Sequence, residues 1–439
     1  MWGAARRRRA VAWGAVPALL AATLVPAACG GNGGDDQRSR TVTQPPAVTP
    51  QPPGPGLTIG LGETNAGLLW APGSAAAPDD AETAALAPWR ERLTALHPRL
   101  YRLLVDWSKL QPDRARAARL DTPADGCARG MKPCDAYAGI REQLRAIRSQ
   151  QLADGGFAVV AVIYNVPAWA AAPPSGCERP DAEPRSRPIA PEALPAYRAL
   201  VRDLDGLARR ERVEIRWWSP WNEPNGAAFV SPQRATCDPA SPALSPAVYA
   251  ELARALRAEL DALPGDQELV LGDLAGITDG GPRSTAVGEF VRALPDDVVC
   301  DAAVAAQHEY SETGPPAPGT DPVAALEGAL DERPCSAGMP VWVTESGVGG
   351  ADAGAARETA PAALRAQCRA LQRDLLRWYA DPRVQAAFQY TFRDDPAYPV
   401  GLADARLTRT WPAYDLLLAW GGTRAADAAP PALPASCRG

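Results

Sequence analysis

Apolar and amphipathic segments alternate along the chain from Leu57 onward. Eight mainly apolar runs of five to seven residues have the length of buried strands, and they cover 57–61, 100–106, 157–163, 213–219, 268–273, 302–308, 340–344 and 385–391. The segments between and after them carry apolar residues at helical spacing, which predicts helices over 82–96, 135–152, 191–210, 246–263, 284–294, 321–331, 358–380 and 412–420. Strict alternation of this kind indicates βαβ units and a parallel sheet.

The number of strand–helix units favours a closed barrel over an open doubly wound sheet. We therefore expect an α/β protein, a (β/α)8 TIM barrel that forms a single domain over residues 57–424. A dinucleotide-binding open sheet is the alternative, but no Gly-x-Gly-x-x-Gly motif follows the first strand. Active sites of such barrels lie at the carboxyl ends of the strands. The residues that end each predicted strand are therefore the candidates for chemistry.

The first 28 residues resemble an export signal rather than part of the barrel. Four consecutive arginines precede an apolar stretch. A membrane-spanning anchor is the alternative, but Pro17 and Pro26 interrupt the stretch. The run VPAAC resembles a bacterial lipobox. That resemblance implies cleavage before Cys29, attachment of a lipid to its thiol, and contact with a membrane through this lipid only.

Two further segments flank the predicted barrel. Residues 29–56 are rich in Gly and Pro, which favours an extended tether, and residues 425–439 form a C-terminal tail. We expect the protein to be exported and either held as a lipoprotein at the outer face of the cell membrane or secreted.

Charge and histidine content exclude several function classes. The 439-residue chain carries a net charge of −6, and removal of the four signal arginines leaves 41 basic against 51 acidic residues, or −10. Nucleic-acid binders usually carry a basic excess, so we expect no nucleic-acid partner. Only two histidines are present, too few for a His-rich binuclear metal centre. We therefore expect no metal and no cofactor.

Two predicted strands end in motifs that carry a glutamate. The fourth strand runs into WNEP, which contains Asn222 and Glu223, and the seventh runs into TES, which contains Glu345. Either motif alone is more often a turn or a solvated charge. Together, on strands four and seven, they resemble the retaining glycoside hydrolases of clan A, the barrel superfamily that includes families 5 and 39. The resemblance covers residues 57 to about 424.

The resemblance implies a retaining glycosidase that cleaves an O-glycosidic, β-linked bond of an oligo- or polysaccharide in a single catalytic domain. Glu223 is then the acid/base, Glu345 the nucleophile, and Asn222 the amide that binds the sugar hydroxyl next to the reacting carbon. The retaining mechanism requires the two carboxyl groups to lie roughly 5–5.5 Å apart. Strands four and seven face each other across an eight-stranded ring, which suits this spacing.

Further residues match the same pattern. His308 and Tyr310 share one face of strand six, and they correspond to a His-x-Tyr motif of the clan in which the tyrosine contacts the nucleophile. The alternation turns Glu309 away from that face. Arg102 occupies the clan position of an arginine that pairs with the nucleophile, here Glu345. A hydrogen-bonded core histidine and a salt bridge between helices remain the alternatives for His308 and Arg102.

Other strand-end residues give weaker signals. Glu63, Asp106 and Asp273 could each bind a sugar hydroxyl, but an N-cap or loop anchor is the commoner role. Trp169, after the third strand, is the tryptophan that we expect to stack on a sugar. The eighth strand ends in FQYTF rather than with the tryptophan usual in the clan. The shape of the subsite for the cleaved sugar is therefore open.

The cysteines fit an exported protein. With Cys29 assigned to the lipid, an even number remains, which suggests disulfides. No Cys-x-x-Cys pair supports zinc. Sequence cannot select among the possible connectivities. Our hypothesis is the sequential set, Cys127–Cys134, Cys177–Cys237, Cys300–Cys335 and Cys368–Cys437.

Three other interpretations remain. A non-catalytic, glycan-binding barrel lipoprotein would keep the groove without turnover. A transporter receptor would need two lobes and a hinge, which the uninterrupted units do not supply. A barrel enzyme with other chemistry would place Glu223 and Glu345 far apart. We expect a monomer whose partner is a carbohydrate substrate.

Overall fold

A computed structural model describes residues 53–69, 81–121, 130–134, 139–178, 182–313, 319–350 and 355–438. The proposed signal, Cys29 and most of the tether lie outside these residues. In the described part of the chain, no helix combines the length and the apolar composition needed to cross a membrane.

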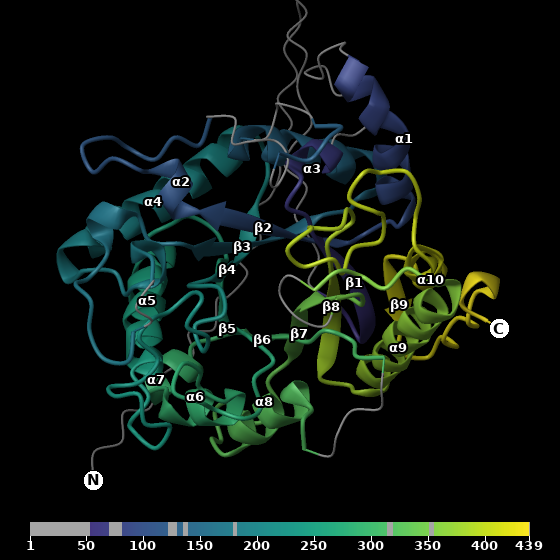
Figure 1. The fold of residues 1–439 in the computed structure, drawn as a ribbon. Helices are drawn as coiled ribbons and strands as arrows, with labels where there is room; N and C mark the ends of the chain where they lie inside the picture. The colour runs from purple at the N-terminus through teal and green to yellow at the C-terminus, as the bar shows by residue number, and fades with distance from the viewer. Residues whose placement is uncertain are drawn as a thin grey trace, which may run out of the picture. The chain divides into compact units, whose positions relative to one another are not determined.

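The strands form a closed parallel barrel. Neighbours pair in the order β2-β3-β4-β5-β6-β7-β8-β1, and β1 also pairs with β2, which closes the ring (Figure 1). The eight strands are β1 Gly56–Gly62, β2 Leu100–Asp106, β3 Ala158–Tyr164, β4 Ile215–Ser219, β5 Glu268–Leu274, β6 Val304–His308, β7 Val341–Ser346 and β8 Val384–Tyr390. The expected TIM barrel is confirmed, with each strand within two residues of its predicted start.

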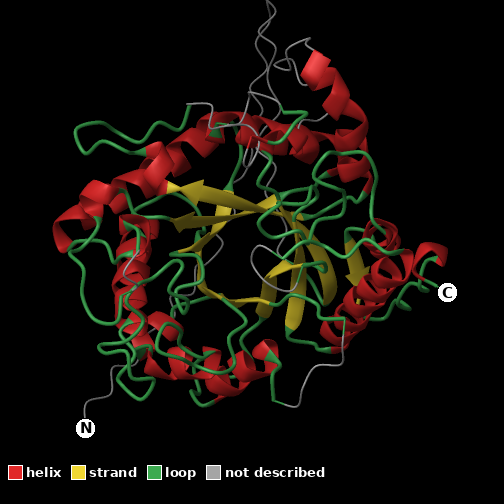
Figure 2. Ribbon diagram, in the orientation of Figure 1, coloured by secondary structure: helices red, strands yellow, loops and turns green. Residues whose placement is uncertain are grey.

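Helices lie outside the ring of strands (Figure 2). They are α1 Ala81–Ala95, α2 Trp107–Leu110, α3 Ile140–Asp154, α4 Leu194–Arg210, α5 Ser245–Leu260, α6 Val287–Ala293, α7 Asp296–Val299, α8 Pro322–Asp331, α9 Pro361–Ala380 and α10 Pro412–Trp420. The short α2 and α7 were not expected. The helix predicted from 191 begins at Leu194, because Pro191–Ala193 forms a 3-10 turn.

The interior of the barrel is a packed core rather than a channel. Alternate residues of the strands point inward and form one cluster of buried side chains, which includes Val160, Trp217, Trp342 and Phe388. A Cβ on Gly60 would lie 2.4 Å from the ring of Phe388. Glycine on β1 therefore makes the space that this large ring fills.

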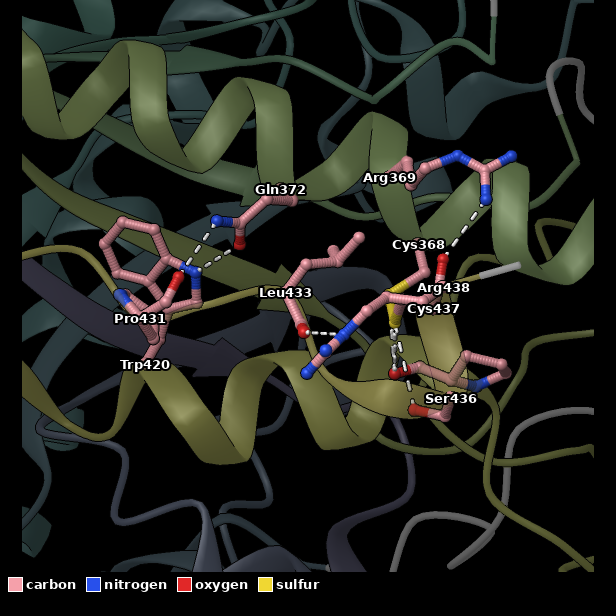
Figure 3. Close-up of a disulfide and its surroundings, with 10 residues drawn as sticks. Cys368, Arg369, Gln372, Trp420, Pro431, Leu433, Ser436, Cys437 and Arg438 are labelled. Carbon is pink, nitrogen blue, oxygen red and sulfur yellow. Dashed lines mark hydrogen bonds between the residues drawn. A yellow bond between two sulfur atoms is a disulfide. The ribbon is translucent and has the colours of Figure 1, made fainter.

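The C-terminal segment returns to the barrel. Strand β9 Thr423–Ala425 pairs antiparallel with β1. The chain then reaches α9, where a disulfide joins Cys368 to Cys437 and Arg369 donates a hydrogen bond to the Cys437 carbonyl (Figure 3). Residues beyond the last barrel helix are thus tied to strand β1 by backbone pairing and to helix α9 by a covalent bond.

Three of the four expected disulfides are confirmed, namely Cys177–Cys237, Cys300–Cys335 and Cys368–Cys437. They connect the loops after β3 and β4, the ends of α7 and α8, and α9 with the tail. The fourth pair includes Cys127, which lies outside the described residues.

Candidate active site

Glu223 and Glu345 meet at the carboxyl ends of the strands. Glu223 lies in the loop after β4, with a positive φ of 40°, and its N–H donates to the carbonyl of Asp273 on β5 at 2.9 Å. Glu345 is on β7. A carboxylate oxygen of each lies within 4.8 Å of the other. Their side chains are 23% and 10% exposed, so both are open to a small ligand yet largely screened from water.

A bulge aims Glu345 into the barrel mouth. The β6–β7 register passes from Gln307↔Val343 to His308↔Glu345, so Thr344 is an extra residue. Trp342 points inward, and simple alternation from it would turn Glu345 outward. The extra residue reverses that direction, as bulges beside functional sites commonly do.

Two donors hold the Glu345 carboxylate. Arg102 contributes Nη1 to one oxygen, and the hydroxyl of Tyr310 donates to the other. Arg102 has no exposed surface. Burial lowers the pKa of Arg102, but Asp273 and Glu345 outweigh it and raise the value, so the guanidinium stays charged. Its Nη2 also donates to Asn222 Oδ1 at 2.5 Å, which fixes Asn222 beside Glu223.

His308 lies against Glu223. Its Nδ1 is 2.8 Å from Glu223 Oε1 and 3.6 Å from Glu345 Oε2. Burial lowers the pKa of His308, but Glu345, with Asp273 and Glu223, raises it to about 9. The imidazole is therefore cationic at neutral pH, and it offers a proton to Glu223 across a short hydrogen bond.

Asp273 joins Arg102, Glu223, His308 and Glu345 in one active-site cluster, whereas the sequence favoured an N-cap or loop anchor for it. Its carboxylate is fully buried and lies 3.3 Å from Arg102 Nη2 and 3.4 Å from His308 Nε2, and it accepts a hydrogen bond from the hydroxyl of Thr344. Burial raises its pKa, but Arg102 and His308 bring it below the ordinary value. Its position at the end of strand β5 was the one sequence feature that pointed to a role in the site.

The other strand-end acids take structural roles. Asp106 caps α2 by accepting from the Lys109 N–H. Glu63 accepts from the backbone N–H groups of Asn65 and Phe392, which anchors the loop after β8. Glu309 points away from the cluster, as the alternation predicts, and contacts Arg377 and Trp378 on α9.

The described contacts of Trp169 are with Gln111 and Trp107, not with the active-site cluster. It is half-buried, donates Nε1–H to the carbonyl of Gln111, and packs edge-on against Trp107 at 5.8 Å. The expected sugar stacking on this ring is not tested by these contacts.

Tyrosines border the cluster where strand eight ends. Tyr390 closes β8, and its ring centroid lies 6.4 Å from those of Tyr310 and Tyr398, which are 4.6 Å from each other. Burial and the nearby Glu345 raise the pKa of Tyr390 well above its ordinary range. The end of β8 thus carries a neutral phenol that offers both a ring and a hydroxyl.

The cluster also has donor atoms spaced for a cation. Glu223, His308 and Glu345 each offer one atom within 4.8 Å of the others. The neighbouring charges favour another use, because His308 carries a proton at neutral pH and Arg102 contacts Glu345. We interpret the arrangement as a group of acids and bases that share protons.

Comparison with known proteins finds solved structures with a similar fold, but it does not assign the chain to a family. No family model matches the chain, and none of the curated proteins matches it. Among solved structures, SrfJ from Salmonella typhimurium has a TM-score of 0.52 and 9% identity, with 83% of this chain and 74% of that chain covered. An endo-β1,6-glucanase has a TM-score of 0.51 and 13% identity, with 86% and 78% covered.

A family 39 glycoside hydrolase from Bacteroides cellulosilyticus is 18% identical, with a TM-score of 0.49. The match covers 83% of this chain but only 63% of that enzyme. At these identities the likeness concerns the barrel fold, and the chemistry must be argued from the residues of the site.

Proposed function

We propose that the protein is a retaining glycoside hydrolase, with Glu345 as nucleophile and Glu223 as acid/base. The observation that carries the proposal is the separation of the two carboxylates, with oxygens within 4.8 Å. Retaining enzymes hold their carboxyl groups about 5–5.5 Å apart, whereas inverting enzymes leave about 6.5–9.5 Å for a water molecule. The spacing in this protein suits direct attack by one carboxylate.

The contacts of each glutamate suit the two roles. Glu345 has lone pairs oriented by Arg102 and Tyr310, so it is prepared to attack the anomeric carbon while the bond to the leaving oxygen breaks. Glu223 protonates that oxygen, and His308 at 2.8 Å is the adjacent proton source. In the second step Glu223 takes a proton from water, and the resulting hydroxide equivalent displaces Glu345 from the sugar. Asn222 is placed by Arg102 to bind a hydroxyl beside the reacting carbon.

Fold similarity is compatible with this proposal, since an endo-β1,6-glucanase shares the barrel. The substrate class that we propose is a β-linked oligo- or polysaccharide. The acidic surface implied by the net charge favours neutral over anionic sugars.

A panel of aryl β-glycosides and polysaccharides tests the activity. We expect turnover with retention of the anomeric configuration, followed by NMR of the first product. Glu345→Ala should abolish turnover, and the isosteric Glu345→Gln should bind the product or substrate without cleaving it. Glu309→Gln is the matched control, because this buried glutamate contacts α9 instead of the cluster. Binding with no turnover by the wild-type protein would favour the glycan-binding alternative.

We also propose that the protein is exported and held by a lipid on Cys29. The three disulfides support an oxidising compartment, where such bonds persist. Labelling of cells with a fatty-acid analogue should mark the wild-type protein but not Cys29→Ser. Label retained in the variant would contradict the anchor.

A further inference from the structure

Asp273 sits on a bulge that turns it into the site. The β5–β6 register passes from Gly272↔Ala306 to Leu274↔Gln307, which leaves Asp273 as the extra residue. Gly272 and Asp273 have positive φ angles of 98° and 57°. Such a conformation is unfavourable for a residue with a Cβ. The backbone therefore departs from a regular strand at the point where this carboxylate enters the barrel.

Asp273 is linked to each of the two glutamates through one intervening side chain. Arg102 lies between Asp273 and Glu345, and His308 lies between Asp273 and Glu223. In addition, the Asp273 carbonyl accepts the N–H of Glu223. A fully buried carboxylate is unfavourable without such partners. One side chain thus fixes the cation beside each reacting group.

The two ring nitrogens of His308 face different acids. Nδ1 faces Glu223 and Glu345, and Nε2 faces Asp273. The charged and titratable groups around the ring come from every packed strand end: Arg102 on β2, Glu223 after β4, Asp273 on β5, Tyr310 after β6 and Glu345 on β7.

The position of the His308 ring protons decides whether Nδ1 can exchange a proton with Glu223. A neutral imidazole carries one N–H, and the partner of the other nitrogen sets its position. With the proton on Nε2, facing a carboxylate, Nδ1 has a lone pair that accepts a hydrogen bond from protonated Glu223. With its only proton on Nδ1, a neutral ring could pass that proton to Glu223 only by becoming an anion, so it could not supply the acid.

We propose that Asp273 is a positioning residue that fixes the Nε2–H tautomer of His308, so that Nδ1 and Glu223 share one transferable proton. This inference rests on the proposed role of Glu223 as the acid. The proton passes from Nδ1 to Glu223 and on to the leaving oxygen, so Glu223 ends the first step as the carboxylate that the second step needs, and the net charge of the site does not change. His308 is then neutral, with Nε2–H still directed at Asp273. The raised pKa of His308, about 9, supports a ring that keeps its second proton at neutral pH.

The chain offers an unusually clean test because it has two histidines. Nitrogen NMR of the full-length protein labelled at histidine would report both rings, and His97→Asn would assign them. His97 is exposed with φ 49°, a conformation that asparagine tolerates. We expect the His308 Nε2 to stay protonated throughout and Nδ1 to titrate well above pH 6.5. A neutral His308 with its proton on Nδ1 would overturn the proposal, without any substitution in the site itself.

Asp273→Asn should reverse the tautomer. Arg102 can only donate, so the amide oxygen of the new side chain turns to Arg102 and its NH2 group turns to His308. We expect the neutral ring to carry its proton on Nδ1 and to titrate at least one pH unit lower. Thr344→Val is the matched control, because it removes a hydrogen bond to the same carboxylate but keeps the charge. An unchanged tautomer in folded Asp273→Asn would overturn the proposal.

Kinetics separate positioning from a general structural effect. For glycosides with poor leaving groups, which need an acid, kcat/KM of Asp273→Asn should fall by about 10²–10⁴-fold. For dinitrophenyl glycosides, which leave without protonation, the fall should be far smaller. Equal losses on both substrates would contradict positioning. Absence of any glycoside turnover in the wild-type protein, with the NMR result intact, would instead reject the proposed function and leave the His308–Asp273 arrangement standing.

Discussion

Arg102 is a charged side chain without exposed surface, and its partners explain how the barrel tolerates it. Glu345, Asp273 and Asn222 all contact the guanidinium. A planar group with several donors suits this convergence better than an ammonium would. At the residue scale, the site is therefore a balanced set of buried charges rather than two isolated glutamates.

Arg102→Met should destabilise the fold as well as the chemistry, since it leaves buried anions without their cation. We expect a loss of about 3–5 kcal/mol in the free energy of unfolding, measured with urea. Arg254→Met is the control, because the Arg254–Asp297 pair is exposed and should contribute about 0–1 kcal/mol. Similar losses in the two variants would contradict this account of Arg102.

The raised pKa of His308 also predicts how stability depends on pH. A pKa of about 9 in the folded protein lies above the unfolded value near 6.5. The contribution of protonated His308 to the free energy of unfolding is therefore complete below pH 6.5, and it is lost as pH rises through about 9. The difference in unfolding free energy between wild type and His308→Gln should shrink over that window. A difference that stays constant from pH 6 to 10 would contradict the charged, buried imidazole.

Residue patterns predicted site roles for Arg102, Glu223, His308 and Glu345, but for Asp273 they favoured an N-cap or loop anchor. Arg102 and His308 follow from the period of two on regular strands. On β5 that period turns Asp273 outward, and the bulge that reverses it depends on tertiary pairing with β6. A register shift of one residue is invisible in hydrophobicity. The resemblance to clan A located Glu345 in spite of a similar bulge on β7.

At the scale of elements, close packing between strands sets what each position can hold. Gly60 on β1 and Phe388 on β8 lie side by side in the ring. Strand boundaries were predictable because buried parallel strands are continuous apolar runs. The loop after β8 was not, since it contains no periodic pattern, and so the contact of Tyr398 with Tyr310 and Tyr390 was not predicted.

Gly60→Ala should force the Phe388 ring out of its position, because a Cβ would lie 2.4 Å from it. Overpacking of this kind costs about 1–3 kcal/mol. On the same strand, the nearest neighbour of a Cβ on Gly62 is at 3.8 Å, an ordinary contact. Urea unfolding of both alanine variants should therefore show a clear loss for the first only. Equal stability would show that the interior is less tightly packed than described.

The tail is fastened to α9 by the Cys368–Cys437 bond, which closes a span of 69 residues. Replacing both cysteines with serine should lower stability by about 2–5 kcal/mol. It should also raise hydrogen exchange in β9 and in the segment after it. The Cys300–Cys335 pair, with a span of 35 residues, is the control, since its removal should leave exchange in the tail unchanged. Full protection of the tail without its disulfide would show that backbone pairing and packing suffice.

At the scale of the whole barrel, the fold gathers residues more than 240 positions apart, such as Arg102 and Glu345, at one mouth. The carboxyl ends of parallel strands all lie on the same side of the barrel. The residues at the predicted strand ends are therefore the candidates for the site. The alternation of strands and helices predicted the barrel. The distances between the charged side chains depend on the closed ring and on its bulges, which the sequence pattern does not show.

The central claim, a covalent sugar on Glu345, is tested most directly by trapping. A 2-deoxy-2-fluoro glycoside of the sugar found active in the substrate panel slows both steps, and a dinitrophenyl leaving group keeps formation of the covalent intermediate faster than its release. We predict a mass increase equal to one fluorosugar on the peptide that contains Glu345, and none in Glu345→Gln. An enzyme that turns over the parent glycoside but carries no label, or carries it on another residue, would contradict the account.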